Sequence, residues 1–227
     1  MEKILVIAAH PDDETLGCGG YLAKHGGNGT RVIFIAEGSS CRFNSDEINE
    51  QHVKDKIAER NNYCINALSI FGISDIKFYN YPCGRLDDMP ILEINKIIEA
   101  EIKDFKPQII LTHAEFDNNN DHRIVFRSTM MATRPGAFKE LNKVISYEIP
   151  SSTEWSFSKV FQPNLFEALE EKHIEKKWEA LKCYKSEVFP YPHPRSYEGL
   201  MTLAKYRGMQ AGVEFSEAYQ IIRSVSI

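Results

Sequence analysis

The sequence lacks the features of a membrane or exported protein. No stretch of roughly eighteen apolar residues runs without a charge, so there is no candidate membrane span. The apolar run from Ile4 to Ala9 follows a single lysine and meets His10 before it is long enough for a signal peptide. The sequence also has no excess of positive charge, because it contains 27 lysines and arginines against 32 aspartates and glutamates, which gives a net charge of -5. We therefore expect a cytoplasmic protein without a membrane span, and no nucleic-acid partner, since no global positive field is present.

Cysteines are few and scattered. There are five, an odd number, and none forms a CxxC pair: Cys18, Cys41, Cys64, Cys83 and Cys183. This pattern excludes a disulfide framework and a thiolate zinc site, and it predicts reduced, mostly buried thiols. With 43% hydrophobic and 26% charged residues, the composition also excludes a disordered or collagen-like chain. The length of 227 residues and the absence of repeats predict a single domain over 1–227.

Short β-rich runs alternate with longer helical patterns. The predicted strands are 3–9, 31–36, 75–79, 108–112 and 143–147, and the predicted helices between them are 16–24, 46–71, 91–105 and 122–133. This alternation is typical of an α/β fold with a doubly wound, mostly parallel sheet and helices on both faces. After Pro150 we expect a strand at 164–169, a helix at 174–183 and a stiff proline-rich loop at 189–194. We interpret this part as a C-terminal extension over the sheet.

Four ionisable side chains follow the first predicted strand directly: His10, Asp12, Asp13 and Glu14. One of these carboxylates, Asp13 or Glu14, could simply cap the next helix, whose N-terminus attracts negative charge. One cap suffices for one helix, however, and two adjacent carboxylates repel each other unless a cation or separate roles relieve them. We therefore favour a binding site at this edge of the sheet.

A second polar cluster follows the fourth predicted strand and contains Thr112, His113, Glu115, 117–121, His122 and Arg123. In a doubly wound sheet the first and fourth strands are neighbours at the switch point, so the loops after them share one crevice. Two imidazoles and a carboxylate are a common set of protein ligands in catalytic zinc sites, where water occupies the fourth coordination position. The sequence therefore predicts a catalytic metal site, in which a carboxylate that is not a ligand takes a proton from water. Spacing alone leaves open which aspartate ligates and which acts as the base.

The segment 9–14, Ala-His-Pro-Asp-Asp-Glu, together with the following Thr-Leu-Gly-Cys-Gly-Gly, resembles the LmbE-like (PIG-L) family of zinc-dependent N-deacetylases. The run 120–123, Asn-Asp-His-Arg, is similar to the family's second motif. The resemblance implies a Rossmann-like sheet and zinc held by His10, Asp13 and His122, with Fe²⁺ as the alternative in the cell. It also implies Asp12 as the general base in hydrolysis of a linear amide C–N bond, which removes the N-acetyl group of an amino-sugar compound.

The sequence departs from the family pattern at Asn119, where many members carry a histidine that stabilises the developing oxyanion. We predict that His113 or His193 serves catalysis instead, although a structural or surface role for either stays open. Arg42, Asn119 and Arg195 are our candidate substrate-binding residues, with solvated arginines as the alternative. The glycines at 17, 19 and 20 lack the dinucleotide spacing and favour close packing of a helix.

The expected partner is a small N-acetylated sugar or sugar conjugate, such as an N-acetylglucosaminyl intermediate of glycoconjugate or polysaccharide synthesis, and a homo-oligomer stays open. Two alternatives remain. The chain could be an amidase for a thiol–sugar conjugate or another small amide, or a non-catalytic nucleotide-sugar or metal-binding module. Acetate release from a panel of substrates would separate them.

Overall fold

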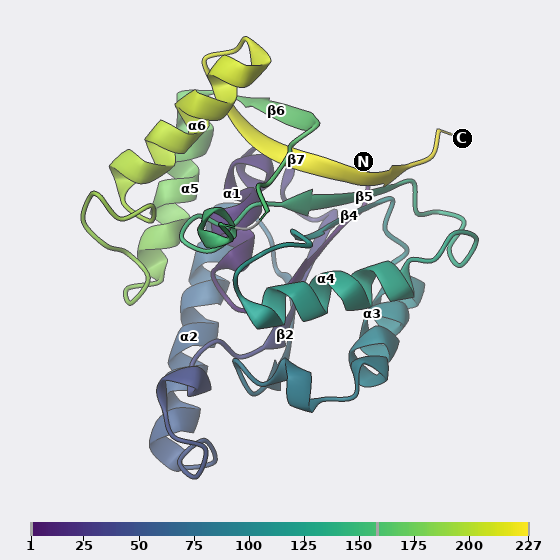
Figure 1. The fold of residues 1–227 in the computed structure, drawn as a ribbon, viewed down its shortest axis with the longest axis vertical. Coiled ribbons are helices and arrows are strands. Elements are labelled where there is room, and N and C mark those ends of the chain that lie inside the picture. Colours follow the sequence, from purple (N-terminus) through teal and green to yellow (C-terminus); the bar gives the residue numbers. More distant parts are fainter. Residues whose placement is uncertain (1, 158, 227) are drawn as a thin grey trace.

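The computed structural model describes residues 2–157 and 159–226 and contains one seven-stranded sheet (Figure 1). The strands are β1 Ile4–Ala8, β2 Thr30–Ala36, β3 Asp75–Tyr81, β4 Ile109–His113, β5 Lys143–Tyr147, β6 Leu165–Leu169 and β7 Phe215–Ser224. Their order is β3-β2-β1-β4-β5-β7-β6. The first five strands are parallel, whereas β7 runs antiparallel to both β5 and β6. The predicted α/β class with a mostly parallel sheet is confirmed.

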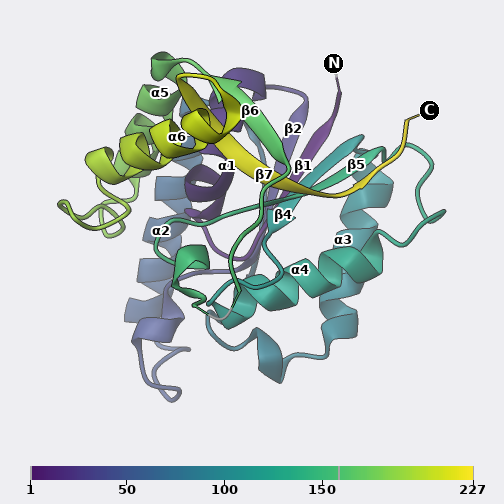
Figure 2. The same ribbon diagram turned by 45° about the horizontal axis from the view of Figure 1, so that its top comes forward.

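Helices cover both faces of this sheet (Figures 1 and 2). They are α1 Asp13–His25, α2 Gln51–Ile70, α3 Ile91–Phe105, α4 Asn120–Ala132, α5 Glu171–Cys183 and α6 Tyr197–Ala211. Alternate residues of β1 point into two separate cores: Ile4 and Val6 pack toward α1, α2 and α5, while Leu5 and Ile7 pack toward α3 and α4. A strand buried on both faces needs a continuous apolar run, which explains the sequence of β1. None of the helices in residues 2–157 and 159–226 is long and apolar enough to span a membrane.

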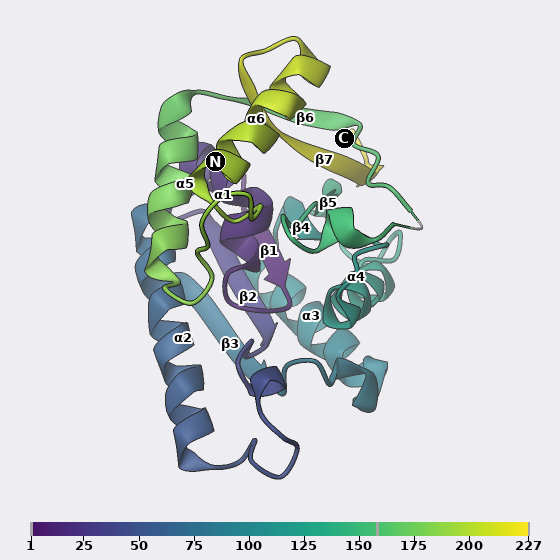
Figure 3. The same cartoon turned by 60° about the vertical axis from the view of Figure 1, so that its left-hand side comes forward.

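The predicted extension over the sheet is wrong in its placement. The chain after Pro150 continues the sheet itself, because β6 and β7 add two antiparallel strands beside β5. Figure 3 shows β7 and β6 beyond β5, with α6 next to them. The sequence pattern does not predict α6 or β7. Two glycines and the buried Arg207 interrupt the apolar pattern of α6, and the first five residues of β7 are all buried although Ser216 and Glu217 are polar.

The glycines of α1 lie against neighbouring elements, as predicted. A Cβ atom at Gly17 would collide with the ring of Tyr147, and one at Gly20 would come within 2.5 Å of Leu169. Helix α1 therefore approaches β5 and β6 more closely than a helix with larger side chains could. This close approach fixes the position of the loop that precedes α1.

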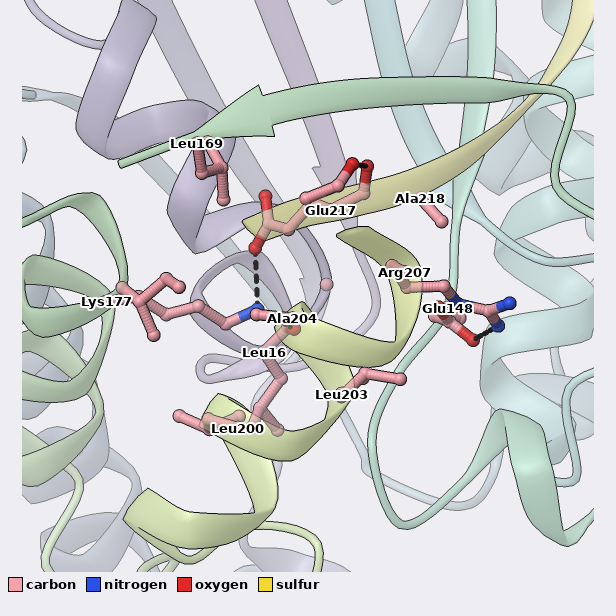
Figure 4. Close-up of a pocket in the computed structure, with 13 residues that line it drawn as sticks. Leu16, Glu148, Leu169, Lys177, Leu200, Leu203, Ala204, Arg207, Glu217 and Ala218 are labelled. Carbon is pink, nitrogen blue, oxygen red and sulfur yellow. Dashed lines mark hydrogen bonds and ion pairs between the residues drawn. The ribbon is translucent and has the colours of Figure 1, made fainter. Parts of the chain in front are cut away.

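Helix α1 is broken at Cys18, whose φ of -140° and ψ of 22° are not helical. Two buried charged residues, Lys177 and Glu217, which face each other in Figure 4, satisfy the backbone groups that the break exposes. Glu217 accepts hydrogen bonds from the N–H groups of Gly20 and Tyr21 at 2.8 and 2.7 Å, and Lys177 Nζ donates to the carbonyl of Leu16 at 2.8 Å. Lys177 and Glu217 also form an ion pair at 2.6 Å. The narrow cavity beside them has a volume of about 20 Å³, so it has room for about one water molecule and not for a substrate.

Candidate active site

The loops after β1 and β4 meet at the carboxyl edge of the sheet, because these two strands are direct neighbours. There the structure brings together His10, Asp13 and His122, all of them buried. The two carboxylate oxygens of Asp13 lie 3.4 Å from His10 Nδ1 and 3.3 Å from His122 Nε2. One ligand atom from each residue lies within 4.8 Å of the others. The predicted ligand set therefore forms one compact cluster, which we call the His–Asp–His cluster.

Each histidine of this cluster faces a second carboxylate with its other ring nitrogen. His10 Nε2 lies 2.9 Å from Asp121 Oδ2, and His122 Nδ1 lies 3.0 Å from Asp117 Oδ1. Both carboxylates are themselves held: Asp121 accepts from the Gly84 and Leu86 amides, and Asp117 from the hydroxyls of Ser152 and Thr153. Metal-ligating histidines commonly have such a carboxylate partner, which fixes the ring orientation and raises ligand basicity. The donor set therefore fits a divalent cation such as zinc.

The charges of the cluster support this interpretation. Burial lowers the pKa of His10, but the carboxylates of Asp121 and Asp13 outweigh burial and raise it to about 9. In the same way, Asp13 and Asp117 overcome burial and raise the pKa of His122 to about 10. Burial opposes ionisation of Asp13, yet His122 and the hydrogen bond from His10 hold its pKa well below the usual range. Excess negative charge thus collects here, and protons on the imidazoles balance it in the absence of a cation.

His113 lies behind the cluster, fully buried. Its ring stacks on that of His122 with 4.1 Å between centroids, and its Nε2 accepts the Ala9 N–H at 2.8 Å. Burial, followed by the neighbouring His122, lowers the pKa of His113 to about 3, so the ring is neutral. The same nitrogen lies 3.5 Å from Asp13 Oδ2. This placement favours a role in positioning His122 through ring stacking and the loop after β1 through the Ala9 amide, while the predicted catalytic role of His113 stays a prediction.

Although it is adjacent to Asp13, Asp12 contacts two arginines with its carboxylate and is not part of the His–Asp–His cluster. Its backbone has φ of 130°, a conformation that costs a non-glycine residue about 1–3 kcal/mol and that clusters at functional sites. Its Oδ2 lies 3.1 Å from Arg60 Nη2 and 3.0 Å from Arg195 Nη1. Burial raises the pKa of Asp12, and the two arginines counteract burial. The backbone turn at Asp12 therefore gives the two adjacent carboxylates separate surroundings.

The helix-capping alternative for these carboxylates is wrong. The N-cap residue of α1 is Asp12, and its side chain makes no capping hydrogen bond. Asp13 Oδ2 instead accepts the N–H of His10 at 2.8 Å, and Glu14 Oε2 accepts the N–H of Asp12 at 3.0 Å. These bonds hold the loop, so the carboxylates shape the site and do not serve the helix terminus.

Three arginines converge on the buried carboxylate of Glu187. Its oxygens lie 2.5 Å from Arg60 Nη1, 2.7 Å from Arg195 Nη1 and 2.8 Å from Arg42 Nη2. Burial would raise the pKa of Glu187, but Arg60 and Arg42 lower it to about 2. The candidate substrate residues Arg42 and Arg195 are therefore fixed on one wall beside Asp12. Sequence reasoning missed Arg60, although its position on the buried stripe of α2, seven residues after Val53, was a signal.

The candidate substrate-binding residue Asn119 and the candidate catalytic residue His193 contact residues close to them in the sequence. Asn119 is the N-cap residue of α4, where its side chain accepts the Asp121 N–H at 2.9 Å. His193 is partly buried, with its ring 4.4 Å from that of Phe189 and 6.2 Å from that of Trp155. The Arg195 N–H donates to His193 Nδ1 at 3.1 Å. Burial, with help from Arg195, lowers the pKa of His193, so its neutral ring carries the proton on Nε2.

Comparisons with known proteins agree with this geometry. The family model described as GlcNAc-PI de-N-acetylase, PIG-L, matches residues 5–133. The chain is 33% identical over 188 residues to the uncharacterized deacetylase YaiS of Escherichia coli, covering 81% of this chain and 90% of that protein.

Two solved structures share the fold. The N,N'-diacetylchitobiose deacetylase of Pyrococcus horikoshii has a TM-score of 0.74 at 20% identity and covers 98% of this chain, with 84% of its own chain matched. The 4-carboxy-2-hydroxymuconate hydratase GalB of Pseudomonas putida has a TM-score of 0.72 at 19% identity, over 100% of this chain and 98% of its own. The fold thus occurs with two different reactions, and the reaction of this chain has to be argued from its side chains.

Proposed function

The chain belongs to the PIG-L family of GlcNAc-PI de-N-acetylases, and from this premise we propose that it is a metal-dependent hydrolase that removes the N-acetyl group from an amino-sugar compound. The observation that carries the proposal is the buried His–Asp–His cluster with an additional carboxylate, Asp12, beside it. A metal hydrolase needs both a ligand set and a separate base. The sugar substrate is inferred from the description of the family and from the name of the similar N,N'-diacetylchitobiose deacetylase.

His10, Asp13 and His122 would hold the cation, for which we propose zinc with Fe²⁺ as the cellular alternative. When bound, such a cation lowers the pKa of water and polarises the amide carbonyl. Asp12 accepts a proton from the attacking water as its oxygen bonds to the carbonyl carbon. When the C–N bond breaks, the same carboxyl group gives that proton to the leaving amine, so acetate and the free amino sugar are formed. Arg60 and Arg195 favour the ionised form of Asp12, which burial opposes.

We propose that His193 stabilises the developing negative charge on the carbonyl oxygen. Because the Arg195 amide occupies Nδ1, the neutral ring presents Nε2–H as a donor, the form that this task requires. We expect His193→Ala to lower kcat by about 10²–10³ while metal content stays unchanged. Steady-state kinetics together with elemental analysis would measure both, and an unchanged kcat would remove His193 from the mechanism.

The proposed activity can be tested by measuring acetate release from N-acetylated sugars, nucleotide sugars, thiol–sugar conjugates and small amides. We expect at least one N-acetyl amino sugar to release acetate, a chelator to abolish the reaction, and added Zn²⁺ or Fe²⁺ to restore it. If a thiol–sugar conjugate or simple amide is the only substrate, the amidase alternative is correct. A protein with full metal content that releases no acetate from the panel is a binding module.

A further inference from the structure

A cavity of about 460 Å³ opens beside the candidate active site. It lies between the 3-10 turn Ser40–Arg42, the first half of α2 and the segment that follows α5. Figure 3 shows α2 and α5 running side by side along this part of the molecule. Arg60 forms part of the cavity wall, and its Nη2 lies 3.1 Å from Asp12 Oδ2. The cavity and the surroundings of the proposed base therefore share one side chain.

The wall of this cavity is strongly cationic. Arg42, Lys56, Arg60 and Lys185 line it, against the single carboxylate of Glu59. Three of these cations already contact carboxylates: Lys56 pairs with Glu59 at 2.8 Å, the buried Arg60 is held between Asp12 and Glu187, and Arg42 lies 2.8 Å from Glu187. Positive charge that remains for a ligand must therefore come from Lys185 and from the exposed part of the Arg42 guanidinium.

Arg42 and Lys185 offer that charge in different ways. Glu187 and the Gly38 carbonyl hold the guanidinium of Arg42 at 2.8 and 2.9 Å, but the side chain remains 51% exposed. Its orientation is thus fixed while the rest of the group faces the cavity. Lys185 has no carboxylate within ion-pair distance in the described part of the chain, and its Nζ lies 5.9 Å from the ring centre of Tyr63. A preoriented guanidinium near an unpaired ammonium suits an anionic group.

We propose that this cavity binds an anionic substituent, a phosphate ester or a carboxylate, carried by the N-acetylated substrate. The inference rests on the proposed function and makes it more specific, because it predicts a preference for charged amino-sugar derivatives over neutral ones. The volume lies in the range of ordinary small-molecule sites. The rings of Phe43 and Tyr63 in the same wall provide apolar surface for the part of the substrate next to the charge.

The metal-loaded enzyme should be compared on N-acetylglucosamine 1-phosphate, N-acetylmuramic acid and the neutral methyl glycoside of N-acetylglucosamine. We expect a higher kcat/KM for at least one of the two anionic compounds than for the neutral glycoside. Comparison of the two anionic compounds shows whether the cavity prefers a phosphate or a carboxylate. Lys185→Gln should lower the ratio of anionic to neutral kcat/KM by about tenfold, the size of one charge-assisted hydrogen bond. Lys54→Gln is the matched control, because it removes the same charge from an exposed position of α2 outside the cavity.

A direct binding measurement with a compound that cannot be deacetylated tests this inference independently of the proposed function. Glucose 1-phosphate, which has no N-acetyl group, should bind in a calorimetric titration, more weakly to the Lys185→Gln protein than to the Lys54→Gln protein. If anionic and neutral sugars are hydrolysed equally well and the two variants behave alike, the inference is wrong and the deacetylase proposal stands. If no amide is hydrolysed, the deacetylase proposal is wrong, and the titration alone decides whether the cavity binds an anion.

Discussion

An Asp12→Asn protein is expected to retain its metal and to turn over about 10²–10⁴ times more slowly. Asparagine keeps the size of the side chain but cannot accept the proton that the attacking water loses. Metal should remain because Asp12 lies outside the His–Asp–His cluster, with its Oδ2 directed at Arg60 and Arg195. Elemental analysis and steady-state kinetics on the same preparation would measure both quantities.

The pH profile gives an independent check of the same assignment. A base acts only when it is ionised, so kcat/KM should fall as the pH drops through the pKa of Asp12. Burial raises that pKa above the usual aspartate value, which moves the acid limb toward neutral pH, and the two arginines limit the shift. In Asp12→Asn this limb should disappear or move.

The adjacent aspartate is the matched control. Asp13→Asn changes the same chemical group one residue away, but Asp13 faces both histidines, so this variant should lose metal. If instead Asp12→Asn loses metal while Asp13→Asn keeps metal and activity, the two roles are reversed. If both variants remain fully active, the reaction takes place elsewhere.

Much of the parallel sheet could be predicted because its strands are buried on both faces. Such strands need continuous apolar runs, as in β1 and β2, and the polar loops after them stand out. Strand β7 could not be predicted in this way. Its first half buries Ser216 and Glu217, and Glu217 is buried in order to serve the broken helix α1, almost 200 residues earlier in the chain. That requirement is invisible in the local pattern of β7.

In the candidate site, too, some features could be predicted from the sequence and others depend on residues far away in the chain. The proposed ligands come shortly after two neighbouring strands, His10 in the loop after β1, Asp13 at the start of α1 and His122 in the first turn of α4. Motif and topology together therefore predicted that these three residues lie close together. The supporting charges come from farther away: Arg60 contacts the proposed base from the middle of α2, and Glu187, in the segment after α5, pairs with Arg60. Asp117 and Asp121 were visible in the polar loop, but their pairing with the outer nitrogens of His122 and His10 depends on ring orientation. Packing decides that orientation, and a single sequence does not record it.

Replacing His122 with alanine is expected to remove most of the bound metal from a protein that still folds. In the proposed site His122 supplies one of three ligand atoms, and the two that would remain, from His10 and Asp13, do not make the three-ligand set typical of a catalytic zinc site. Elemental analysis of the purified variant, with circular dichroism to show that it is folded, measures the effect. His52→Ala is the control, because this histidine lies on α2 with its side chain 51% exposed and should leave the metal content unchanged.

The pH dependence of metal affinity makes the ligand assignment sharper. A cation displaces the protons on its histidine ligands, and the pKa values of about 9 for His10 and about 10 for His122 mean that both rings are protonated at neutral pH without metal. Metal affinity, measured by competition with a chelator, should therefore rise with pH, by about 100-fold per pH unit below pH ~8 for two displaced protons. In His122→Ala the rise should fall to about tenfold per unit, since one imidazole remains. A folded His122→Ala protein with full metal stoichiometry and the wild-type pH slope would show that the cation is bound by other residues.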